Sequence, residues 1–123
     1  MRYLITIIFI SCLLNSCQSN NIDINQFRTG TFKTFLNDND VTSLAIRNDS
    51  IQIEIYNNVK DTFDIEWKSN FEYVLLKSHP KNELDSTPFH VKITGFKDNS
   101  YTFKANYKGS NFKQKGKAIK LKD

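Results

Sequence analysis

The chain has 123 residues and a formal net charge of +4, with 17 lysines and arginines against 13 aspartates and glutamates. This length allows one folded domain beyond a leader segment, and only 4 glycines argue against a propeller or a β-helix. Aromatic residues make up 13% of the chain, which favours strands over helices. The composition therefore predicts a single small all-β domain.

Residues 1–16 have the order of a secretory signal peptide. Arg2 supplies a positive charge, an apolar run extends from Leu4 to Leu14, and the small Ser16 stands before Cys17. The run is too short for a spanning helix, which needs about 20 apolar residues. We therefore expect residues 1–16 to be removed, and Cys12 to leave with them.

The segment Leu14-Asn15-Ser16-Cys17 resembles a bacterial lipobox, whose cysteine becomes the lipidated first residue of the mature protein. The resemblance implies that Cys17 is acylated, that a membrane is the first partner, and that residues 17–26 form the anchor and a short tether. Two or three acyl chains make a durable anchor. Gln18 follows Cys17 in place of the aspartate of many inner-membrane lipoproteins, which favours an outer-membrane anchor facing the periplasm. The alternative is an ordinary signal peptide in which Cys17 has no role.

Residues 27–123 form the predicted domain and repeatedly alternate apolar with polar side chains, as strands with one buried face do. Strands are expected over residues 27–35, around Leu44 and Ile46, and over 51–55, 63–67, 71–76, 89–93, 101–107 and, as a short last strand, 119–121. In the third of these, Ile51, Ile53 and Ile55 are expected to be buried.

Short polar pairs separate several of these strands: Asn48-Asp49, Ser69-Asn70 and Asp98-Asn99. Asn and Asp suit tight turns, so neighbouring strands should be antiparallel. Longer connections are expected over residues 78–88 and 109–116. About eight strands in an up-and-down meander can close into a small barrel and remove exposed edges. A twisted open sheet or a two-sheet sandwich is the alternative.

The stretch from Phe27 to Phe32 contains Gly30, which is expected to break the first strand with a bulge or at a close backbone approach. An early glycine followed by an aromatic residue, opening an eight-stranded meander, resembles the lipocalin and fatty-acid-binding (calycin) group. In that group an aromatic residue just after the glycine closes the barrel floor, a role that the resemblance gives to Phe32. The resemblance concerns architecture and carries no ligand specificity.

Three segments, FRTGTFK at 27–33, IRNDSIQIE at 46–54 and IEWKSNFEYVL at 65–75, resemble short lipoproteins of Bacteroidota, particularly flavobacteria. Some proteins of that group carry the label DNA topoisomerase IV. The short chain, its expected export and the lack of an acidic metal-binding cluster beside any tyrosine all oppose that activity.

Catalytic motifs are missing from the sequence, which has no Gly-x-Ser-x-Gly elbow and no Gly-rich phosphate loop. The best polar group for a metal is His79, Glu83, Asp85 and His90, but their spacing matches no known zinc pattern and a solvated loop is the plainer interpretation. We therefore expect no enzyme activity, no cofactor and no bound metal.

Charge is unevenly distributed, because acidic residues dominate positions 38–72 and lysines dominate the C-terminal part. The expected basic surface consists of Lys104, Lys108, Lys113, Lys115, Lys117, Lys120 and Lys122. It would suit anionic lipid, glycan or an acidic envelope protein. The plainer interpretation is a lysine-rich edge strand that resists pairing with other chains. Nucleic acid is not an expected partner in an exported compartment.

Two functions remain open for such a domain. Either the barrel carries a small apolar ligand, or the same aromatics fill the interior and the outer surface acts as a non-enzymatic envelope interaction or accessory module. The residues concerned are Phe63, Trp67, Tyr73, Phe89, Phe103 and Tyr107. The interior of an eight-stranded barrel is one that side chains can just fill or that can hold one small ligand. So many large inward groups favour filling, and therefore the interaction module.

Two tripeptides, Asp49-Ser50-Ile51 and Asp85-Ser86-Thr87, resemble the Asp-Ser/Thr-apolar sites at which Bacteroidota O-glycosylate exported proteins. The resemblance makes Ser50 and Ser86 candidate glycosylation sites. Ser86 lies in the longer expected loop and is the more accessible of the two.

Overall fold

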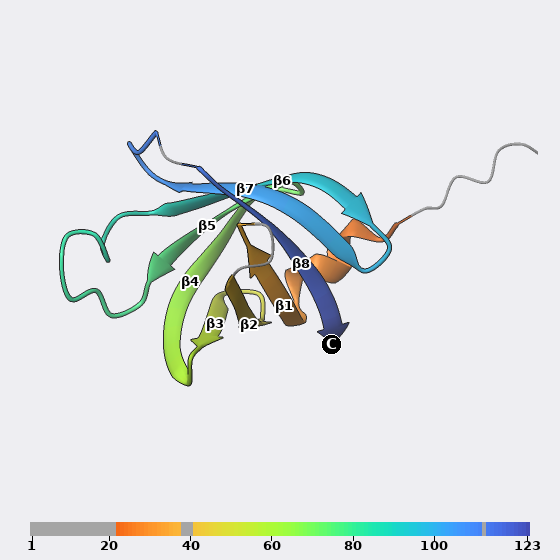
Figure 1. Cartoon of the computed structure of the whole chain (residues 1–123), viewed down its shortest axis with the longest axis horizontal. Coiled ribbons are helices and arrows are strands. Elements are labelled where there is room, and N and C mark those ends of the chain that lie inside the picture. The colour runs from red at the N-terminus through yellow and green to blue at the C-terminus, as the bar shows by residue number, and fades with distance from the viewer. Residues whose placement is uncertain (1–21, 38–40, 112) are drawn as a thin grey trace, which may run out of the picture.

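Eight antiparallel strands form a closed barrel in a computed structural model that describes residues 22–37, 41–111 and 113–123 (Figure 1). Each strand pairs with the next along the chain, and the last pairs with the first. The elements are η1 (Ile24–Arg28), a 3-10 helix, followed by β1 (Gly30–Leu36), β2 (Val41–Arg47), β3 (Ile51–Tyr56), β4 (Val59–Ser69), β5 (Glu72–Lys77), β6 (Phe89–Lys97), β7 (Ser100–Tyr107) and β8 (Gln114–Lys122). The prediction of an all-β, up-and-down barrel is confirmed.

Strand β8 closes the barrel by pairing with both β1 and β7. The prediction of a short last strand is wrong, because β8 begins at Gln114 and has nine residues. Its inward positions include the small residues Gly116 and Ala118, which give no strong apolar pattern. Because β8 has neighbours on both sides, its lysines do not protect an open edge, and that interpretation is also wrong.

Helix η1 lies across one end of the barrel, beside the β6–β7 turn (Figure 1). It buries Phe27 completely, with its ring 5.5 Å from that of Phe96 and 5.2 Å from that of Tyr101. Gln26 Nε2 donates to the Asp98 carbonyl oxygen at 3.2 Å, and Ile22 packs against the core. Residues of the predicted tether therefore pack against the barrel, and the strands, η1 and the core that the structure describes all lie within residues 22–123.

Gly30 begins β1 and does not break it, but the expected close backbone approach is present, and the pairing of β1 with β8 shifts register between Thr31 and Phe32. The φ of +123° at Gly30 is unfavourable for other residues, and a Cβ there would lie 2.6 Å from the Lys122 carbonyl oxygen. Two residues later, the fully buried Phe32 packs into the closed end of the barrel. The glycine thus permits β1 and β8 to approach closely where the barrel closes.

In β4 to β7 the apolar face of the alternating pattern points into the barrel, as predicted. Its buried residues include Ile65, Tyr73, Val91 and Phe103. In β2 and β3 the other face of the alternating pattern points inward. The inward residues are Ser43, Ala45, Arg47, Gln52 and Glu54. Leu44 and Ile46 are 38% and 43% exposed on the outer face, and Ile51, Ile53 and Ile55 share that face. The prediction that these isoleucines are buried is wrong. This side of the barrel has a polar interior.

Within the described part of the chain, no helix has the length and apolar character needed to cross a membrane. The predicted signal peptide and the predicted lipidation site at Cys17 lie outside the described residues.

Candidate ligand-binding cavity

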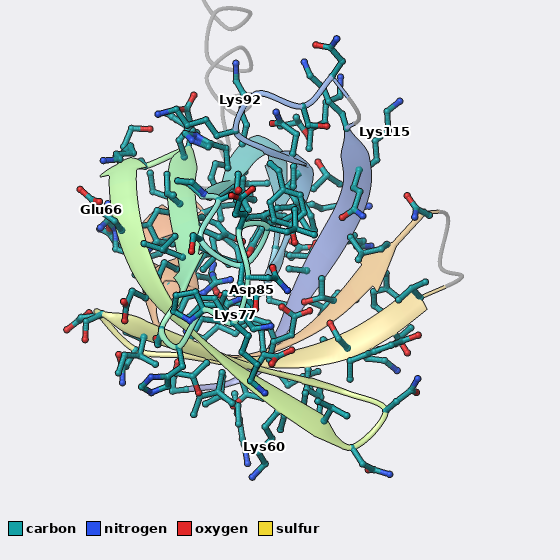
Figure 2. The ribbon with its side chains drawn as sticks, turned by 90° about the vertical axis from the view of Figure 1, so that its left-hand side faces the viewer. Lys60, Glu66, Lys77, Asp85, Lys92 and Lys115 are labelled. Carbon is teal, nitrogen blue, oxygen red and sulfur yellow. The ribbon has the colours of Figure 1, made fainter. Side chains whose placement is uncertain are left out.

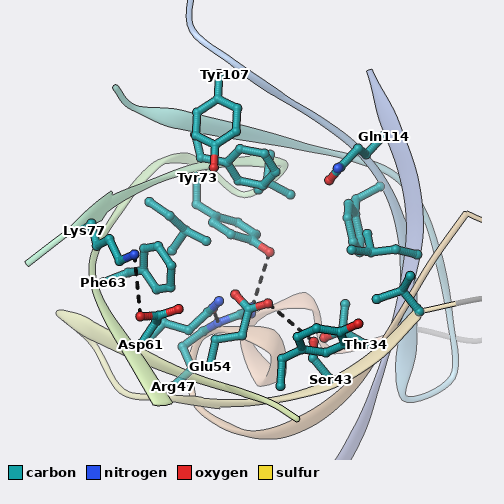
Figure 3. A pocket seen from close by; sticks show the side chains of 18 of the residues that line it. Thr34, Ser43, Arg47, Glu54, Asp61, Phe63, Tyr73, Lys77, Tyr107 and Gln114 are labelled. Atoms are coloured by element: carbon teal, nitrogen blue, oxygen red, sulfur yellow. Dashed lines mark hydrogen bonds and ion pairs between the residues drawn. The ribbon is translucent and has the colours of Figure 1, made fainter. Parts of the chain in front are cut away.

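A cavity of about 360 Å³ occupies the half of the barrel farther from η1 (Figure 3). Its apolar lining includes five of the six residues proposed to contact a ligand: Phe63, Tyr73, Phe89, Phe103 and Tyr107. The sixth, Trp67, does not line the cavity and instead packs 4.7 Å from the ring of Tyr73. Large side chains therefore fill only the closed half of the interior, contrary to the expectation of a filled barrel.

The floor of the cavity is built around Arg47, which is 4% exposed. Its Nη1 donates to the Phe27 carbonyl oxygen at 2.7 Å, and its Nε donates to Gln52 Oε1 at 2.9 Å. Its Nη2 donates to the hydroxyls of Tyr73 and Tyr101 at 3.3 and 3.0 Å. Arg47 thus joins β2 to β3, β5, β7 and η1, and its contacts account for most of its hydrogen-bonding capacity.

The groups that accept hydrogen bonds from the charged guanidinium of Arg47 are all neutral. Burial alone would lower its pKa, but the two tyrosine hydroxyls oppose this and the pKa is raised overall. Burial also raises the pKa of Tyr73 far above its usual value, and the neighbouring Tyr101 adds to this. The guanidinium carbon lies 4.5 Å from the ring centre of Phe32, a favourable cation–π arrangement. Arg47 therefore stays charged and Tyr73 stays protonated. The hydrogen bonds of Arg47 hold the strands and η1 together at the floor of the cavity.

One wall of the cavity carries three charged residues that come from β4, β5 and the β5–β6 loop. Asp61 on β4 and Asp85 in the β5–β6 loop each lie 3.5 Å from Lys77 Nζ on β5. Figure 2 shows Lys77 and Asp85 close together on the open side of the barrel. The Lys81 backbone hydrogen bond lowers the pKa of Asp85, and Lys77 lowers it further. This ion-paired group fixes the loop over the cavity mouth.

Glu54 projects into the middle of the cavity from β3 (Figure 3). Its Oε1 accepts a hydrogen bond from Ser43 Oγ at 3.5 Å, the weak limit of such a contact. In the strand register it stands directly opposite Asp61. Burial raises the pKa of Glu54 and Asp61 adds to this, while the Ser43 hydrogen bond opposes it. Among the described residues, no cation lies within 4.0 Å of its carboxylate.

The polar cavity residues were not found from the sequence. Arg47, Gln52, Glu54 and Lys77 each occupy a polar position next to an apolar residue, which is also the pattern of a solvated outer face. No signal within β2 and β3 separates the two faces, because a strand that alternates apolar and polar residues fits either orientation.

Six of the seven predicted surface lysines are exposed, but Lys120 is not. Its side chain is 10% exposed, donates to the Gln26 carbonyl oxygen at 2.6 Å and pairs with Asp123 at 2.7 Å. Three lysines stand opposite one another on neighbouring strands: Lys92 faces Lys104, and Lys104 faces Lys115. We call these three the lysine row. Figure 2 shows Lys92 and Lys115 on the outside of the barrel.

The loop residues considered for a metal do not come together. Asp85 turns into the cavity mouth, whereas His79 and His90 are exposed, the latter between Val74 and Asn106 on the outer face. Within the described residues, no three His, Cys, Asp or Glu side chains form a group that could hold a metal.

Both candidate glycosylation residues, Ser50 and Ser86, are exposed. Ser50 lies in the β2–β3 turn, and Ser86 donates to the Asn82 carbonyl oxygen at 3.3 Å within the β5–β6 loop. Both positions are therefore sterically compatible with modification.

Comparisons with known proteins find no family model, no curated protein and no solved structure that matches this chain.

Proposed function

We propose that the protein is an exported, lipid-anchored carrier that binds a small amphipathic molecule inside its barrel. The observation that carries the proposal is the cavity of about 360 Å³, which lies within the usual range for small-molecule sites. Aromatic and aliphatic side chains line much of it, and a few charged groups are held in fixed places by hydrogen bonds. Such a mixture is typical of ligand sites. The resemblance of residues 14–17 to a lipobox supports an anchor at Cys17 and an envelope location.

Blocking the cavity mouth should abolish binding of an apolar probe. Leu36 lines the cavity, so Leu36→Trp places an indole at the mouth. The neutral fluorophore N-phenyl-1-naphthylamine should bind to residues 22–123, and the variant should bind it at least about 10-fold more weakly, because the added ring takes up cavity volume. Fluorescence titration measures both affinities.

The matched control is Leu44→Trp, which adds the same ring on the outer face of β2, where Leu44 is 38% exposed. Its affinity for the fluorophore should equal that of the unaltered domain. Equal binding by both variants would show that the fluorophore occupies the surface, and no binding by the unaltered domain would count against a ligand cavity.

The lysine row supports a second proposed function, contact with an anionic surface. Like charges directly opposite one another on neighbouring strands are destabilising, and Glu72 on β5 stands opposite only the first lysine of the row, Lys92. None of the three lysines forms an ion pair within the described residues, and the closed barrel leaves no edge for them to protect. Contact with anionic membrane lipid would offset that repulsion and hold the tethered barrel against the bilayer.

Vesicle binding tests this second function. Residues 22–123 should bind vesicles containing phosphatidylglycerol and not vesicles of pure phosphatidylcholine. Each lysine near a charged membrane contributes about 1 kcal/mol, so replacing Lys92, Lys104 and Lys115 with glutamine should weaken binding by about 100-fold. The control replaces the exposed Lys60, Lys68 and Lys81 instead. Equal losses in both triple variants would show that net charge alone decides binding.

A further inference from the structure

Resting on the proposed carrier function, we infer that the ligand carries a positively charged group, such as a protonated amine, which pairs with Glu54 inside the cavity. The inference depends on which charged side chains of the cavity already have partners. Five charged residues line it: Arg47, Glu54, Asp61, Lys77 and Asp85. Three carboxylates therefore face two cations, and the lining has an excess of negative charge.

Both cations of the cavity are already engaged. Arg47 donates to four acceptors in the floor and lies against the rings of Phe32 and Tyr73. Lys77 lies between Asp61 and Asp85, 3.5 Å from each. An acidic ligand would have to compete with these contacts and would also meet the excess of carboxylates. The cavity therefore disfavours an anionic group near its centre.

Glu54 is the carboxylate that lacks a cation. Its contact with Ser43 at 3.5 Å is weak, and Asp61 stands directly opposite it across the β3–β4 pair. Enclosure in the barrel and this second carboxylate both disfavour its ionised form, as the raised pKa indicates. A ligand cation at this position would relieve both effects, because it would replace lost hydration with a charge-assisted hydrogen bond.

The apolar walls beyond Glu54 suit the rest of such a ligand. Phe63 lies on β4, while Phe89 and Tyr107 form an edge-to-face pair with ring centres 5.0 Å apart. Aromatic faces attract cations as well as apolar groups. We therefore expect a compact aromatic or aliphatic amine, held by its charge at Glu54 and by its apolar part among these rings.

Three probes with the same ring system test the inference. They are the cation of 1-naphthylmethylamine, the neutral 1-naphthylmethanol and the anion 1-naphthaleneacetate. Calorimetric titration of residues 22–123 should show the amine binding about 10-fold more tightly than the alcohol. In Glu54→Gln, which keeps the shape of the side chain, the amine should lose about 10-fold in affinity while the alcohol changes by less than about 2-fold. Glu72→Gln removes an exposed carboxylate outside the cavity and should change neither affinity.

The outcomes separate this inference from the carrier function. Alcohol binding without a preference for the amine, tightest binding of the acetate, or unchanged amine affinity in Glu54→Gln would each overturn the inference alone. Failure of all three probes and of the neutral fluorophore would overturn the carrier function as well. Glu54→Gln removes a charge that the enclosed site disfavours, so the variant should be at least as stable as the unaltered domain at neutral pH. A thermal melt of both proteins checks this and shows that lost binding does not come from lost folding.

Discussion

Replacing Arg47 with methionine is expected to lower the free energy of unfolding by about 3 kcal/mol. Methionine keeps an unbranched apolar stem but is shorter and has no hydrogen-bond donors, so the Phe27 carbonyl and the Gln52 amide oxygen lose their partners in a buried floor. The cation–π contact with Phe32 is lost as well. Urea unfolding of residues 22–123, followed by the fluorescence of Trp67, measures the change.

Lys60→Met is the control for Arg47→Met, because it removes one positive charge from an exposed position at the start of β4. Figure 2 shows Lys60 pointing away from the barrel. This variant should change the free energy of unfolding by less than about 0.5 kcal/mol. If Arg47→Met lost no more free energy of unfolding than this, the hydrogen bonds of Arg47 would not stabilise the floor of the cavity.

Replacing Gly116 with alanine is expected to cost about 2 to 4 kcal/mol of stability. A Cβ at this position would overlap the ring of Phe103 and lie 2.7 Å from the Phe35 carbonyl oxygen. Phe103 is buried, and Phe35 belongs to the adjacent strand, so one of them must move. The β1–β8 pairing that closes the barrel should weaken, which hydrogen exchange of β1 and β8 amides would detect alongside thermal unfolding.

Gly109→Ala provides the comparison for this second variant. Gly109 has a φ of +83°, so alanine is strained there, but a Cβ would meet no atom within 4 Å. A loss of about 1 kcal/mol is expected, without increased exchange in β1 or β8. Equal effects of the two substitutions would contradict a role for Gly116 in barrel closure.

The strands that sequence reasoning described best are those whose inward residues are large and apolar. In β4 to β7 the alternation places Ile65, Tyr73, Val91 and Phe103 inside, and the structure has them there. Asn57 and Asn58, which form the β3–β4 turn with φ of 48° and 64°, were missed although asparagine readily adopts this conformation. The number and order of the strands thus followed from the period and from most of the turns.

Periodicity gave two faces for β2 and β3 but did not say which faces inward. A rule that apolar residues are buried chose Ile53 and Ile55, whereas the barrel encloses Gln52 and Glu54. The reversal is possible because buried polar groups find hydrogen-bond partners, as Gln52 does with Arg47 on the adjacent strand at 2.9 Å. The other partners of Arg47 belong to η1, β5 and β7, so no local pattern in the sequence reveals the whole network.

The candidate site was therefore only half predictable. Its aromatic wall follows from strand alternation, and five of six expected residues line the cavity. The cavity itself depends on how inward side chains from eight strands share the interior. Small or polar residues such as Ser43 and Gln114 leave space there that the aromatic content alone did not suggest. Interior volume is a property of the closed barrel and of no single segment.

The most direct test of a ligand carrier is a native mass spectrum of the domain isolated from the envelope of the producing cell, compared with the same sample after denaturation. The carrier function predicts an excess mass on the order of a few hundred daltons that disappears on unfolding. It also predicts that the excess is absent from Leu36→Trp and retained in Leu44→Trp. Identical native and denatured masses, or an excess that persists in Leu36→Trp, would contradict a ligand held in the cavity.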